Sequence, residues 1–236
     1  MKGRLKGSKF VAAVLSLMML TVGFGGTPVQ AASYPFSDNV EVPTANNWVA
    51  DPPWAKMTTD AHSANTSWTD SPGGYYANNA NVALTLATPV ALPSGGKPQL
   101  KFWHHYQLEA GFDFAYVELS TDGGANWPNR LATYSGTITA PYRLGQTSVK
   151  SVETPQSTSP EPWVFEQLDL TSYAGQSNVK IRYRLVSDNS VARDGWCLDD
   201  IGIAELPPAV TMNATSNPTQ TSLSLSWSQS TAPDFA

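Results

Sequence analysis

The stretch NVKIRYRLV, residues 178–186, decides the fold class. Its apolar side chains alternate with basic ones: the apolar set is Val179, Ile181, Tyr183 and Leu185, and the basic set is Lys180, Arg182 and Arg184. A period of two indicates a β-strand that buries one face. Strands buried on one face are typical of antiparallel sheets that pack on another sheet.

The same alternation recurs through the middle of the chain. It is present in NVALTL (81–86), QLKFWHHYQL (99–108) and FDFAYVELS (112–120), and past the first thirty residues no run of ten has a helical period. Asp122-Gly123-Gly124 is a hairpin signal, because glycines accept a positive φ. Several short strands with turns and without helices predict an all-β, antiparallel two-sheet sandwich.

Three segments divide the chain. Residues 1–31 hold a basic head, a short apolar run and the small residues Val29 and Ala31, which is the order of a secretory signal peptide cleaved after Ala31. The apolar run is shorter than a membrane span. Residues 32–205 are the sandwich, with a Ser/Thr/Pro-rich loop at 147–163. Residues 206–236 form a linker and a strand that resembles the start of a fibronectin type III module, of which the rest is not in this chain.

The net charge and the cysteine content limit the partners and the covalent links that this chain is expected to have. Without the four basic side chains of the leader, ten basic groups oppose nineteen acidic ones, a net charge of −9. This excludes nucleic acid and an anionic membrane as expected partners, and it suits divalent cations outside the cell. The single cysteine, Cys197, excludes an internal disulfide and is expected to be a small buried side chain.

Three longer pieces together resemble a known family. They are SWTDSPGGYYANNANVALTL (67–86), the stretch from Leu100 to Trp127, and the stretch from Leu170 to Ile203, which ends in DGWCLDDIGI. Their order is similar to that of the MAM-type module of secreted bacterial proteases, of the immune inhibitor A and bacillopeptidase F kind. Two positions differ from that family: Cys197 replaces an aromatic or aliphatic residue, and Val40 replaces the Phe expected before Glu41.

This resemblance implies a jelly-roll sandwich with no chemistry of its own. It implies an accessory or adhesion-type module of a larger secreted hydrolase, a peptidase, which contacts protein or glycan outside the cell and other domains of the same protein. It also implies a structural cation, usually calcium.

Candidates for catalysis are weak in this sequence. The chain has three histidines, His62, His104 and His105, and no helix to place a zinc-peptidase pair. His104 and His105 are adjacent on a strand and point to opposite faces, so one is expected among aromatics and the other exposed. Glu109, Asp113 and Glu118 lie near one another in the sequence, as the carboxylates of a glycosidase would, but Asp113 and Glu118 fall on opposite faces of a regular strand.

Carboxylates are the better candidates for a site. On a regular strand Asp199 shares a face with Ile201 and Ile203 and points inward, whereas Asp200 points the other way. A buried carboxylate needs a cation or an ion pair. The partner is therefore either Arg182, Arg184 or Arg193, or a calcium ion. The further oxygen ligands of that ion are expected from the set Asp200, Glu41, Asp38, Asp70 and Asn78.

Aromatic residues offer the third possibility. Most tryptophans of a sandwich belong to its core, but Trp54, Tyr75 and Tyr76 lie in loop-like sequence and are the candidates for exposed rings. Exposed rings that stack on sugars would make the chain a carbohydrate-binding module, which is the alternative function. A row of exposed aromatics would favour that alternative, and aromatics that all lie inside would favour the scaffold.

Overall fold

The computed structural model describes residues 32–42, 46–137 and 162–206. The predicted leader and the predicted fibronectin-like strand lie outside these residues, as does most of the predicted loop at 147–163. Within the described residues no helix is long and apolar enough to cross a membrane. The one helical turn that they contain is the 3₁₀ segment η1, Thr171–Tyr173.

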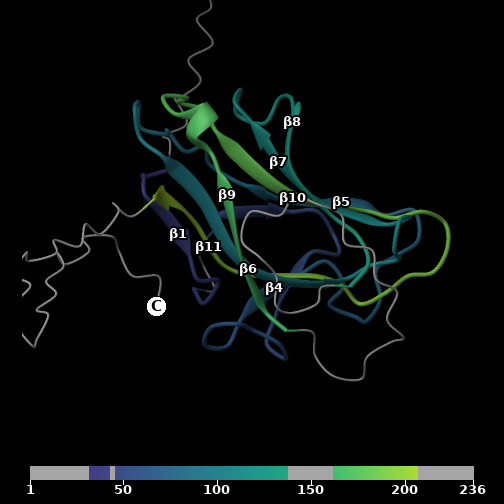
Figure 1. The fold of residues 1–236 in the computed structure, drawn as a ribbon. Helices are drawn as coiled ribbons and strands as arrows, with labels where there is room; N and C mark the ends of the chain where they lie inside the picture. The colour runs from purple at the N-terminus through teal and green to yellow at the C-terminus, as the bar shows by residue number, and fades with distance from the viewer. Residues whose placement is uncertain (1–31, 43–45, 138–161, 207–236) are drawn as a thin grey trace, which may run out of the picture.

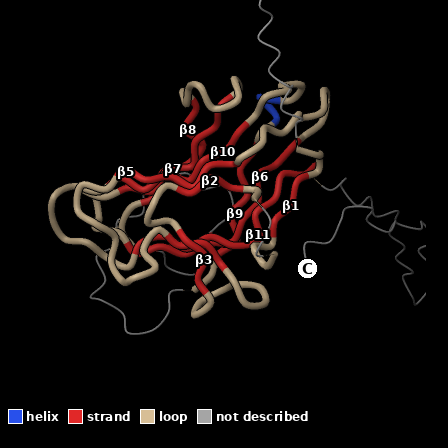
Figure 2. Tube along the Cα trace, turned by 180° about the vertical axis from the view of Figure 1, so that it is seen from behind, coloured by secondary structure: helices blue, strands red, loops and turns tan. Residues whose placement is uncertain are grey.

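Two antiparallel sheets form the fold, and Figure 2 shows them as two layers. In sheet order, the first contains β3 (Ala55–Met57), β4 (Ser67–Thr69), β11 (Gly195–Glu205), β6 (Pro98–Gln107) and β9 (Val164–Asp169), with β1 (Phe36–Asp38) also paired to β11. The second contains β2 (Trp48–Ala50), β5 (Asn81–Leu86), β10 (Lys180–Val186), β7 (Phe114–Ser120) and β8 (Asn129–Tyr134).

The chain crosses repeatedly between these sheets (Figure 1). The order β4-β11-β6-β9 in one sheet and β5-β10-β7-β8 in the other is that of an eight-stranded jelly roll. The predicted all-β, two-sheet jelly-roll sandwich is therefore confirmed.

The core lies between the sheets and follows the predicted alternation. Ile181, Tyr183 and Leu185 of β10 have no exposed surface, whereas the basic residues between them are partly exposed. Tyr183 packs against Trp48 and Trp196, with ring centroids 5.8 and 5.5 Å apart. Burial of such large side chains is the main favourable contribution to folding in a chain without a disulfide.

A β-bulge in β11 changes the direction of its acidic residues. The pairing of β11 with β6 shifts register between Asp199 and Gly202, and Asp200 has a φ of 47°. Leu198 and Ile201 both reach the core, although an odd spacing would separate them on a regular strand. The prediction that Asp199 shares the inward face of Ile201 and Ile203 is therefore wrong, because the bulge breaks the alternation.

Candidate functional site

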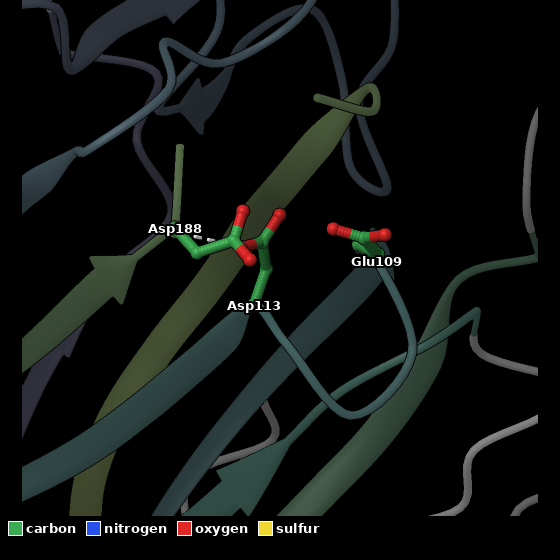
Figure 3. Close-up of side chains that lie close together, drawn as sticks. All are labelled: Glu109, Asp113 and Asp188. Atoms are coloured by element: carbon green, nitrogen blue, oxygen red, sulfur yellow. Dashed lines mark hydrogen bonds between the residues drawn. The ribbon is translucent and has the colours of Figure 1, made fainter. Parts of the chain in front are cut away.

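Three carboxylates converge at one end of the sandwich. Glu109 follows β6, Asp113 precedes β7, and Asp188 follows β10. One oxygen of each carboxylate lies within 4.8 Å of the other two, and Asp113 is buried while the others are partly exposed. Figure 3 shows the three side chains pointing toward a common centre. Among the described residues this is the group of acids whose geometry fits a metal ion.

Tyr76 fixes this centre from the neighbouring loop. Its hydroxyl donates to Asp113 Oδ2 at 2.5 Å and accepts the Glu109 backbone N–H at 3.1 Å. The Asp188 backbone N–H donates to Asp113 Oδ1 at 2.8 Å. Burial and the hydrogen bond to Asp113 raise the pKa of Tyr76 above its ordinary value. Both oxygens of Asp113 are thus held in place by donors from two different loops.

Strand pairing explains why these acids meet. β7 and β10 are neighbours, and Phe114 pairs with Val186. Asp113 and Asp188 therefore emerge side by side from adjacent strands. From the sequence alone, Asp113 is a candidate only as half of a glycosidase pair, because the proximity of residues 113 and 188 depends on a strand pairing that no local pattern reports.

Asp199 and Asp200 hold a loop instead of pairing with arginine. Asp199 Oδ2 accepts the backbone N–H groups of His62 and Ser63 at 2.9 and 3.0 Å. Asp200 lies 2.7 Å from His62 Nδ1 and accepts the Ser63 hydroxyl at 2.8 Å. Burial raises the pKa of Asp199 to about 6. Backbone donors therefore partly offset the cost of burying this carboxylate.

The predicted arginine partners lie elsewhere. Arg182 and Arg184 both donate hydrogen bonds to Glu118. The distance from Arg182 Nε to Glu118 Oε2 is 2.6 Å, and that from an Arg184 guanidinium nitrogen to Glu118 Oε1 is 2.7 Å. Arg193 forms no ion pair with Asp199 among the described contacts. The arginine alternative for Asp199 is therefore wrong.

Glu41 and Asp38, the other predicted ligands, also bind N–H donors. Glu41 accepts the backbone N–H groups of Asn65 and Thr66 at 2.9 and 2.8 Å, so it holds the same loop as Asp199 and Asp200. Asp38 instead accepts the Trp48 indole N–H at 2.8 Å. A calcium ion shared by Asp199, Asp200 and Glu41 stays a prediction.

Asp70 is the most isolated of the predicted ligands. It follows β4 and is fully buried, and its Oδ1 accepts the Trp196 backbone N–H at 2.7 Å. Its Oδ2 has no hydrogen-bond partner. Burial raises the pKa of Asp70 to about 7, because the charged form loses its hydration. Asn78, the further oxygen candidate, uses its side-chain amide to bind the Asn189 carbonyl at 3.0 Å.

The exposure of the candidate aromatics differs from the prediction. Trp54 and Tyr76 are only 4% and 3% exposed, so the expectation that they present free ring faces is wrong. Trp54 packs edge-on against Trp196, and Tyr76 turns inward to bind Asp113. Tyr75 is 56% exposed, as predicted, and Phe112, which the sequence did not single out, is 60% exposed.

The histidines occupy three different environments. His104 lies in the core and accepts the Trp196 indole N–H at 3.2 Å, and burial lowers its pKa to about 3. His105 is also buried, beside Asp60 at 2.9 Å, so the expectation that one of the adjacent pair is exposed is wrong. His62 stacks on Trp103 with ring centroids 3.8 Å apart.

The fold and the site define a jelly-roll β-sandwich with acidic clusters on its loops. The model of the family described as "Immune inhibitor A-like, MAM domain" matches residues 39–212. The chain belongs to this family, as the resemblance in its sequence predicted.

Two curated relatives are proteases. Bacillopeptidase F of Bacillus subtilis (strain 168) is 30% identical over 162 residues, which are 69% of this chain and 10% of the relative. Pre-pro-metalloprotease PrtV of Vibrio cholerae serotype O1 is 24% identical over 128 residues, 54% of this chain and 12% of the relative. The chain thus spans about a tenth of the length of these relatives.

Solved structures show a weaker likeness. The K1 cleaved adhesin domain of Lys-gingipain from Porphyromonas gingivalis W83 aligns with a TM-score of 0.48 and 15% identity, over 74% of this chain and 99% of that one. The xylan-binding domain from CBM 22 aligns with a TM-score of 0.43 and 12% identity, over 72% and 93% of the two chains.

Proposed function

We propose that this chain is a non-catalytic accessory module of a larger secreted hydrolase, a peptidase, and that it positions or stabilises the catalytic part. The observation that carries this proposal is the family match over residues 39–212, together with protease relatives of which this region is about a tenth. The basic and apolar leader before Ala31 supports export. The partners would then be neighbouring domains of the same protein and proteins or glycans outside the cell.

The test of the accessory role compares the full-length secreted protein with a version that lacks residues 32–205. If the module is accessory, the shortened protein still cleaves a short peptide at the normal rate per folded molecule. It inactivates faster on heating or loses activity on large protein substrates. The proposal fails if cleavage of the short peptide disappears although the remainder is folded, or if the isolated chain itself cleaves casein.

Calcium is the proposed structural cation. Oxygen ligands suit calcium, and the carboxylates of Glu109, Asp113 and Asp188 already lie close enough to share one ion. Such an ion would fasten the ends of three strands together, because the three acids come from β6, β7 and β10. The loop held by Asp199, Asp200 and Glu41 is the second place where calcium would act.

Carbohydrate binding is the second candidate function. Tyr75 and Phe112 are exposed, and they lie next to Tyr76 and Asp113, whose hydrogen bond joins the two loops. Exposed rings beside carboxylates that accept hydroxyl hydrogen bonds would suit a sugar. Trp54 and Tyr76 are buried, so their rings are not available to stack on a sugar at this site.

A polysaccharide pull-down panel tests this candidate. Retention of the chain by one polysaccharide, lost in a Tyr75→Ala/Phe112→Ala double variant with unchanged melting temperature, would support it. Absence of retention on every polysaccharide would reject it. Equal retention of the wild-type chain and the double variant would place the binding away from this surface.

A further inference from the structure

The second sheet carries a charge opposite to that of the protein as a whole. Its five strands contain four basic residues and one acid, Glu118, which is a net charge of +3. In the strands of the first sheet six acids oppose two lysines, and past the predicted leader the chain as a whole has a net charge of −9. The four basic residues, which we call the basic face, are Lys180, Arg182 and Arg184 of β10 and Arg130 of β8.

The basic face lies on the outer side of the sheet. The residues of β10 that alternate with the three basic ones are buried in the core, so the basic side chains point outward and are partly exposed. Arg182 pairs with Glu118 across one strand boundary, and Glu118 pairs with Arg130 across the next. The single acid of the sheet is thus placed between two arginines, in a row across three strands.

Aromatic rings hold the arginines of this face in place. The guanidinium carbon of Arg130 lies 3.7 Å from the centroid of the Tyr116 ring, and that of Arg182 lies 4.4 Å from the centroid of Trp127. Phe114 stacks on Tyr116 with ring centroids 5.9 Å apart. Arginines that are already fixed lose less conformational entropy when they bind a partner. The ring faces that the arginines cover are not available to stack on a sugar.

The basic face keeps hydrogen-bond donors that Glu118 does not use. Arg182 donates to Glu118 through Nε, and its two terminal nitrogens have no hydrogen-bond partner among the described residues. The Lys180 ammonium group likewise makes no hydrogen bond to them. Because one carboxylate cannot neutralise four basic groups, the face attracts further anions. Carboxylates suit it best, since an arginine can bind one through two parallel hydrogen bonds.

The spacing of the basic residues favours an extended chain as the source of these carboxylates. Lys180, Arg182 and Arg184 follow one another at every second position of β10, which places them ~6.7 Å apart. An extended polypeptide with acids at every second position repeats its carboxylates at the same interval. A second copy of this chain, docked through the same face, would instead bring like charges together.

We propose that the basic face binds an extended acidic segment of another polypeptide, with Asp or Glu at alternate positions. The segment lies along β10, and its carboxylates bind Lys180 and the terminal nitrogens of Arg182, with Arg130 at the side. This inference goes beyond the accessory role proposed above. Its test needs no peptidase, so a negative result would leave that role untouched.

Fluorescence anisotropy of a labelled peptide tests the proposal on the full secreted chain. The probe alternates Glu and Thr over about ten residues, which spans ~33 Å when extended and so covers the length of β10. We expect it to bind, and to bind more weakly as the salt concentration rises. A peptide in which Gln replaces Glu should not bind. A peptide with the same number of Glu at every third position should bind at least about threefold more weakly, because its carboxylates point to both sides of an extended chain.

The double variant Lys180→Gln/Arg130→Gln locates the binding. It leaves Arg182 and Arg184 on Glu118, so the melting temperature should stay within a few degrees of wild type, whereas the peptide should bind at least about fivefold more weakly. Lys97→Gln/Arg193→Gln is the matched control, because it removes two positive charges outside the second sheet. If the double variant does not fold, Lys180→Gln alone replaces it and should still weaken binding.

Three outcomes would overturn the proposal. They are no binding of the alternating peptide at low salt, equal affinity of the double variant and its control, and equal affinity for the two Glu spacings. Two further results would assign the face to another occupant and so overturn it as well. One is binding of polygalacturonate, but not of the peptide, that is lost in the double variant. The other is a dimer in sedimentation experiments that the double variant does not form.

Discussion

Gly195 and Asp70 are packed so closely that residue 195 has no room for a side chain. A β-carbon on residue 195 would lie 2.3 Å from Asp70 Oδ1, and the glycine φ of 99° is one that other residues rarely adopt. The loop that follows β4 therefore depends on a glycine from β11, more than a hundred residues later in the chain.

Gly195→Ala is predicted to destabilise the protein by about 2–4 kcal/mol, because it combines a steric clash with an unfavourable φ. Gly73→Ala is the matched control, since nothing lies within 4 Å of its added β-carbon. The control should change stability by less than about 0.5 kcal/mol. Urea unfolding of both variants measures the difference, and equal midpoints would show that the Asp70 packing is looser than described.

Tyr76→Phe is predicted to cost about 1–3 kcal/mol, because it leaves Asp113 Oδ2 and the Glu109 N–H without their common partner. Tyr75→Phe removes the same hydroxyl from the neighbouring, exposed ring and should be neutral within about 0.5 kcal/mol. Thermal unfolding of the two variants under identical calcium concentrations tests this contrast. A larger loss in Tyr75→Phe would reverse the assignment of the two rings.

Glu118→Gln is predicted to cost about 2–3 kcal/mol at pH 7, because it removes the charge that Arg182 and Arg184 share. A guanidinium nitrogen of Arg130 lies 3.7 Å from Glu118 Oε1, and the Arg130 side chain is half exposed. Arg130→Gln should therefore lower the free energy of unfolding by less than about 1 kcal/mol. Denaturant titrations at pH 7 compare the two variants.

The effect of Glu118 should also depend on pH. Burial raises the pKa of Glu118, and the hydrogen bonds from Arg184 and Arg182 more than reverse that rise, so the pKa lies below its ordinary 4.5. The stability that its charge contributes is therefore present above pH 4.5 and is lost as the pH falls through the folded-state pKa. The difference in free energy of unfolding between the wild-type chain and Glu118→Gln should therefore become smaller below pH 4.5. A difference that grows below pH 4.5 would contradict the predicted direction of the pKa shift.

Local patterns predicted the parts of the fold that depend on alternation. The strand around Ile181, Tyr183 and Leu185 was correct because its side chains contact a core on one face only. The predicted direction of Asp199 was wrong because a bulge at Asp200 adds a residue. The local signal of that bulge in LDDIGI is Gly202, since a glycine inside a strand often marks one.

The candidate site was harder to predict because its parts come from separate strands. Tyr76 was expected to be exposed like Tyr75, yet it turns toward Asp113, a residue from another loop. Asp113 and Asp188 meet only because β7 pairs with β10. The loop sequence predicts Asp70 as a ligand, but its close packing against Gly195 of the last strand is a long-range contact that the loop sequence does not show.

Calcium removal is the most direct test of a cation-stabilised accessory module. The full secreted chain is melted in millimolar calcium and in excess chelator, followed by near-ultraviolet circular dichroism. Calcium at about a hundred times its dissociation constant adds about 2.7 kcal/mol, which for a sandwich of this size raises the melting temperature by roughly 5–10 °C. The shift should shrink in Asp188→Asn. A melting temperature that is the same with and without calcium would contradict the account.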